Sequence, residues 1–69
     1  MMTRSEFETV IDSMRAAFEV YDSVVEKRQV LIVKYGTESL TMNIFGDEIE
    51  TDKETLTTNL IELIFVGGS

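Results

Sequence analysis

The fold of this chain is decided by residues 29–45, which read QVLIVKYGTESLTMNIF. The first run, Gln29–Tyr35, is rich in β-branched side chains and apolar on both faces, so it predicts a strand that is covered on two sides or lies inside a larger sheet. Gly36–Ser39 supplies a turn, and Leu40–Phe45 alternates between apolar and polar side chains, as a half-buried strand does. The two runs therefore predict an antiparallel β-hairpin.

The segment before the hairpin, from about Thr3 to Arg28, is predicted to form one long helix. Thr3 with Glu6 and Ser5 with Glu8 both have the spacing of a capping box, so either Thr3 or Ser5 could begin the helix. The apolar side chains then recur at intervals of four and three, which is the heptad seam of a helix that packs along another helix. The seam residues are Phe7, Ile11, Met14, Phe18, Tyr21 and Val25.

The segment after the hairpin is predicted to form a second helix. Gly46 breaks the strand, and Thr51 with Glu54 has the spacing of a second capping box. A helix from about Asp52 to Phe65 would carry one apolar stripe, made by Leu56, Leu60, Ile61, Leu63 and Ile64. Residues 60–66 would also fit one face of a strand, but the explicit start signal favours the helix.

These elements predict one small α+β domain, residues 1–69, with the order αββα: a long N-terminal helix, an antiparallel β-hairpin and a C-terminal helix. A chain of this length buries only about 60% of the surface that its unfolded form exposes. Its core alone should therefore stabilise it by only roughly 3–5 kcal/mol. Because the chain has no cysteine, disulfides cannot add to this, and self-association is the expected support.

The predicted long helix favours a homodimer. A helix of about 24 residues would be roughly 36 Å long, whereas a strand of six or seven residues is about 20–23 Å. The apolar seam from Phe7 to Val25 would then extend beyond the hairpin and need another cover. We expect two copies to join through this seam, through the Gln29–Tyr35 strand, or through both. The alternative is a monomer in which both helices cover one face of the hairpin.

The composition excludes several classes of function. The chain has neither histidine nor cysteine, and it contains no glycine-rich phosphate-binding loop. Two carboxylates could perform acid–base catalysis only inside a pocket, for which so small a core leaves little room. We therefore expect no catalytic residue, no metal site, no cofactor and no enzymatic activity. The chain has no apolar run long enough to span a membrane and no signal peptide at its start, so we expect a cytoplasmic protein.

The charge is strongly acidic and unevenly distributed. The chain carries a net charge of −7, of which residues 47–69 carry −5. Five acidic side chains lie within eight residues: Asp47, Glu48, Glu50, Asp52 and Glu54. One interpretation is that they stabilise a helix start and keep a loop in solvent. The other is that they bind a basic surface, with the neighbouring Phe45 as an aromatic contact if it is exposed and not covered by Ile49.

Together these features predict a non-enzymatic, acidic protein-binding module. A negative charge disfavours nucleic acids and anionic membranes and favours basic partners. The sharper expectation is an inhibitor or regulator of a nucleic-acid-handling protein, such as an anti-CRISPR-like protein or a DNA mimic, from a phage or mobile element. Two alternatives remain: an assembly protein that acts through homo-oligomerisation, and a weak nucleic-acid binder that uses Arg4, Arg15, Lys27 and Arg28.

Overall fold

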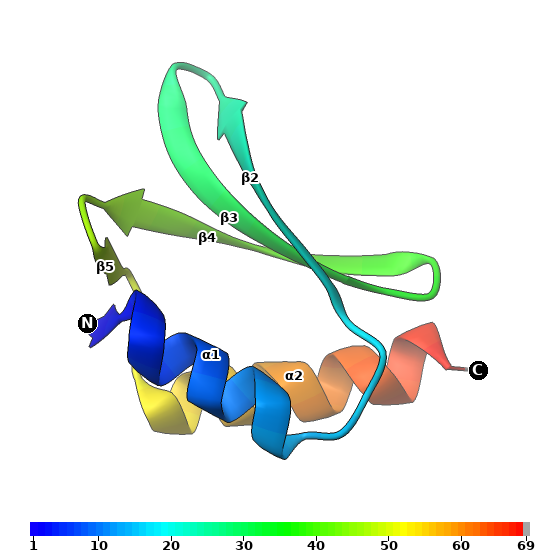
Figure 1. Ribbon diagram of the computed structural model, residues 1–69. Helices are drawn as coiled ribbons and strands as arrows, with labels where there is room; N and C mark the ends of the chain where they lie inside the picture. The colour runs from blue at the N-terminus through cyan, green and yellow to red at the C-terminus, as the bar shows by residue number, and fades with distance from the viewer. Residues whose placement is uncertain (69) are drawn as a thin grey trace.

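The computed structural model describes residues 1–68 and shows two helices packed on one face of an antiparallel sheet (Figure 1). The strands are β1 (Met2–Thr3), β2 (Glu19–Val25), β3 (Arg28–Tyr35), β4 (Glu38–Phe45) and β5 (Glu48–Ile49), and the helices are α1 (Arg4–Ser13) and α2 (Lys53–Gly67). The strand order across the sheet is β1-β5-β4-β3-β2. The predicted α+β class is confirmed. The predicted order αββα is wrong, because three further strands join the hairpin.

The predicted hairpin forms the centre of this sheet. β3 and β4 pair from Val30↔Asn43 to Tyr35↔Glu38 around a tight turn in which Gly36 has a φ of +61°. Leu31 and Val33 point toward the helices and are buried, so their neighbours on β3 face the other side of the sheet. β3 also pairs with β2, which makes it an inner strand with no free edge.

The predicted long helix over residues 3–28 is wrong. α1 ends at Ser13, and Arg15 has a φ of +53°, which lies outside the α-helical region. Residues 19–25 then form β2, because valine and tyrosine side chains favour strands and because β3 offers a partner from Lys34 to Arg28. Glu26 and Lys27 both have positive φ values, as the type I′ turn of a two-residue hairpin requires.

The predicted second helix is confirmed as α2, and the alternative of a strand over residues 60–66 is wrong. α2 begins one position later than the predicted capping box implies, because Asp52 and not Thr51 is the N-cap residue. None of the helices formed by residues 1–68 is long and apolar enough to cross a membrane.

The hydrophobic core lies between the sheet and the two helices. The most completely buried large side chains come from all three layers: Phe7, Leu31, Val33, Ile49, Leu56 and Leu60. Each such side chain stabilises the fold by about 1.5–3 kcal/mol relative to an exposed position. Phe18 lies at the edge of this core, where its ring meets that of Tyr35 edge-on at 5.7 Å.

Candidate protein-binding surface

The acidic segment lies at one end of the molecule, where both helices begin (left in Figure 1). Gly46, with a φ of +63°, turns the chain from β4 into β5, and the buried Ile49 anchors β5 to the core. β1 pairs with β5, and the backbone N–H of Arg4 donates to the carbonyl oxygen of Asp47 at 3.1 Å. The start of α1 is thereby held beside the acidic segment. We call this region, made by residues 1–6 and 45–54, the acidic end.

Asp52 has a structural role at the acidic end. Its carboxylate accepts hydrogen bonds from the backbone N–H of Thr55 at 2.8 Å and from the Thr55 hydroxyl at 3.1 Å. The backbone hydrogen bond is the main cause that lowers the pKa of Asp52 from its ordinary value, and the hydroxyl bond adds to it. Asp52 thus stabilises the first turn of α2, as the first interpretation of the acidic segment proposes for a helix start.

Glu6 adds a carboxylate that the sequence did not assign to this region. The predicted capping box is confirmed: the Thr3 backbone N–H donates to Glu6 Oε1 at 2.9 Å, and the Glu6 N–H donates to the Thr3 hydroxyl at 3.1 Å. The hydrogen bond from the Thr3 backbone is the main cause that lowers the pKa of Glu6. Glu6 and Asp52 line a common groove of about 280 Å³ between the starts of the two helices. The pairing of β1 with β5, the backbone hydrogen bond from Arg4 to Asp47 and the packing of α1 against α2 bring them together.

The other four carboxylates of the segment differ in their contacts. Glu50 accepts a hydrogen bond from Asn43 Nδ2 at 3.1 Å. Asp47, Glu48 and Glu54 are exposed and form no side-chain hydrogen bond or ion pair with any residue from 1 to 68. We call these three the free carboxylates. Their charges have no structural partner within the described chain and are available to a binding partner.

Phe45 lies beside two of the free carboxylates, Asp47 and Glu48. It is the last residue of β4, it pairs with Glu48 across the strands, and 55% of its surface is exposed. The sequence left open whether Phe45 is exposed or covered by Ile49. Ile49 pairs with Ile44 and is buried in the core, so it leaves Phe45 uncovered. Phe45 also lines a shallow groove of about 210 Å³ with Arg28 and Asn43, where the end of β4 separates from β3.

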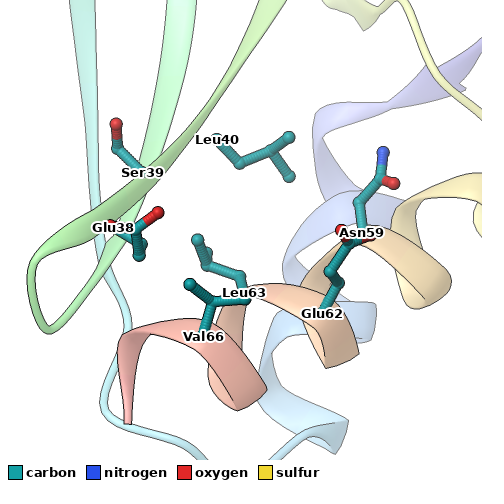
Figure 2. A pocket seen from close by; sticks show the side chains of 7 residues that line it. All are labelled: Glu38, Ser39, Leu40, Asn59, Glu62, Leu63 and Val66. Atoms are coloured by element: carbon teal, nitrogen blue, oxygen red, sulfur yellow. The ribbon is translucent and has the colours of Figure 1, made fainter. Parts of the chain in front are cut away.

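A third groove, of about 260 Å³, lies between β4 and the C-terminal half of α2 (Figure 2). Glu38 on the strand side and Glu62 on the helix side border it, with Leu40 and Leu63 between them. Both carboxylates are exposed. Ser39 also lines the groove, and neither carboxylate accepts a hydrogen bond from it. Within residues 1–68 no three His, Cys, Asp or Glu side chains gather in a way that could hold a metal ion.

The six residues predicted for a dimer interface do not form a helical seam. Phe7 is buried in the core of its own chain, and Ile11, Met14 and Phe18 pack against that core from α1 and the following loop. Tyr21 and Val25 are exposed on β2. The predicted interface through Gln29–Tyr35 also lacks an edge, because β3 is paired on both sides.

No protein-family model, no curated protein and no solved structure matches this chain.

Proposed function

We propose that this protein is a non-enzymatic binding module that docks its acidic end on a basic surface of a partner protein. The observation that supports the proposal is the position of Phe45, an exposed aromatic side chain that lies beside Asp47 and Glu48, two carboxylates without partners. Aromatic side chains often supply most of the binding energy of an interface, and surrounding charges accelerate and orient association.

The carboxylates of the acidic end fall into two groups: those that hold a helix start and those that face solvent. Asp52 and Glu6 are held by the helix starts, whereas Asp47, Glu48 and Glu54 extend into solvent. A partner that carries arginine or lysine can pair with the free carboxylates without breaking a contact inside this protein. Such binding would weaken as salt rises, because exposed charges are screened at a distance of about 8–10 Å at physiological ionic strength.

In its sharper form the proposal is that the basic surface is the nucleic-acid-binding groove of the partner. A row of exposed carboxylates can occupy basic side chains that otherwise contact phosphates. The protein would then inhibit or regulate a nucleic-acid-handling protein by competition, in the manner of a DNA mimic, as a phage or mobile-element product acting in the cytoplasm. This form predicts that the partner cannot bind this protein and duplex DNA at the same time.

The test is a pulldown from the native host at low salt, with a matched pair of charge variants. Asp47→Lys with Glu48→Lys should abolish retention of the partner, and Phe45→Ala should reduce it. Glu8→Lys with Asp12→Lys makes the same change of charge on α1, at two exposed side chains without partners, and should retain it. Phe65→Ala removes a side chain that is 81% exposed near the other end of α2 and serves as the aromatic control.

Equal retention by all variants would contradict the proposal. Displacement of the captured partner by duplex DNA would support the DNA-mimic form, and simultaneous binding of both would contradict that form while leaving a binding module in place.

A further inference from the structure

β2 forms one edge of the sheet. It pairs with β3 through seven residues on one side, and within residues 1–68 no strand pairs with its other side. Its last pairs with β3, Val24↔Gln29 and Val25↔Arg28, lie beyond the last pair of β3 with β4. The hairpin therefore extends away from the rest of the sheet, as Figure 1 shows.

Of the usual protections of an edge strand, β2 carries only the charged side chains Glu19 and Asp22. Edge strands of soluble proteins commonly carry lysine, proline or a bulge, which prevents pairing with another chain. β2 contains neither lysine nor proline, and its ladder with β3 is regular. Four of its seven residues are exposed apolar side chains: Val20, Tyr21, Val24 and Val25. The opposite edge, β1, is only two residues long.

The sequence of β2 is complementary to itself when two copies run antiparallel about a two-fold axis through Ser23. In this register the residue numbers of every directly opposite pair have the same sum. Tyr21 therefore faces Val25 of the second copy, and Val24 faces Asp22. Glu19 falls beside Lys27 in the hairpin turn of the second copy, which places opposite charges together at both ends. Apolar and opposite-charge pairs across strands are the stabilising ones.

The neighbouring symmetric registers fit less well. An axis through Asp22 places two carboxylates directly opposite each other, which is destabilising. An axis through Tyr21 leaves Val24 and Val25 beyond the end of the partner strand.

We propose that two copies of this chain pair through their β2 edges, with the two-fold axis at Ser23, to form a continuous ten-stranded sheet. Arg4 at the acidic end pairs with Asp22 on β2, but none of the free carboxylates lies on β2, so the two proposals can fail independently.

A single cysteine tests the register, because the chain has no cysteine of its own. Directly opposite residues in an antiparallel pair have Cα atoms about 4.5–5.5 Å apart, within the range that a disulfide bridges. Oxidised Ser23→Cys should therefore give a covalent dimer. Thr41→Cys is the control: it lies on the same face of the sheet, opposite Ile32, and is exposed on an inner strand. Failure of Ser23→Cys to form more dimer than Thr41→Cys would overturn the proposal.

Light scattering tests the pairing without a covalent bond, first on the wild-type protein and then on variants with charged side chains in β2. The mass of the wild-type protein, measured by light scattering from micromolar to millimolar concentration, should rise from 7.8 kDa to twice that value. Tyr21→Lys and Val25→Glu should each weaken dimerisation by about tenfold, because each alters two symmetry-related pairs. The double variant places Lys opposite Glu and should restore the dimer. A mass of 7.8 kDa at every concentration, or no rescue, would contradict the register. Asp47→Lys with Glu48→Lys should leave the mass unchanged.

Discussion

Gly36 and Gly67 lie in direct backbone contact, although 31 positions separate them in the chain. A Cβ atom on Gly36 would overlap the carbonyl oxygen of Gly67, and a Cβ atom on Gly67 would overlap the carbonyl oxygen of Tyr35. The β3–β4 turn thus rests on the last turn of α2. The contact closes the core at the end opposite the acidic end, beside the ring pair of Phe18 and Tyr35.

We predict that Gly36→Ala destabilises the protein by about 3 kcal/mol or more, because a left-handed backbone costs about 1–2 kcal/mol and the overlap with Gly67 adds to it. Gly46→Ala is the matched control: its φ is also positive, but open space surrounds the new Cβ. It should cost about 1 kcal/mol. Urea unfolding followed by circular dichroism measures both. Equal losses would show that the backbone contact contributes nothing.

The capping carboxylate Asp52 predicts a pH dependence. Its pKa in the folded protein lies below the ordinary value of 3.8, because the Thr55 N–H and hydroxyl donate to it. Its contribution to stability is therefore fully present above pH 3.8 and is lost as the pH falls through the lowered pKa. Asp52→Ala should lower the unfolding temperature at neutral pH, and its difference from wild type should shrink in strong acid. Glu38→Gln, at an exposed carboxylate on β4 without a partner, should show no such difference at either pH. A constant difference between wild type and Asp52→Ala across this range would contradict the assignment.

Two phenylalanines should separate stability from binding. Phe7 is 1% exposed, and Phe7→Ala should cost about 3–5 kcal/mol, enough to unfold a domain of this size. Phe45→Ala should change the free energy of unfolding by no more than about 0.5 kcal/mol, because half of the side chain already contacts solvent. Thermal unfolding compares the two. A large loss for Phe45→Ala would mean that this side chain supports the fold and would remove the reason for placing it in a binding surface.

The ion pair between Arg4 and Asp22 links the start of α1 to β2 at 3.0 Å, with 42% and 64% of the two side chains exposed. We predict that Asp22→Asn costs under about 1 kcal/mol and that the cost disappears at high salt. Asp12→Asn, at an exposed carboxylate without a partner, should have no effect at either salt concentration. Urea unfolding at low and high ionic strength checks both.

Much of the fold could be predicted from local patterns. The spacing of a few side chains predicts the β3–β4 hairpin, the faces of β3, the second helix and the Thr3–Glu6 capping box. The long helix could not be recognised as wrong, since Tyr21 and Val25 fit a heptad and also fit every second position of a strand. The turn that distinguishes the two, Glu26-Lys27, contains no glycine or asparagine.

The candidate site was predictable in composition and not in arrangement. Asp47, Glu48 and Glu54 stand out in the sequence. Whether a carboxylate has a hydrogen-bond partner depends on tertiary contacts, such as that of Asn43 with Glu50. β1 and β5 are two residues each, too short for any periodicity, and their pairing helps to hold Glu6 at the acidic end.

The strand order β1-β5-β4-β3-β2 places the two proposed binding surfaces toward opposite edges of the sheet. Asp47 and Glu48 lie at β5, near one edge, and β2 is the other edge. If two β2 edges pair, seven inter-strand spacings separate the two β5 strands, which is about 34 Å before the twist of the sheet shortens it. The assembly would then be bivalent, and a partner with two basic patches at that spacing would be held by avidity, so that two weak contacts give one long-lived complex.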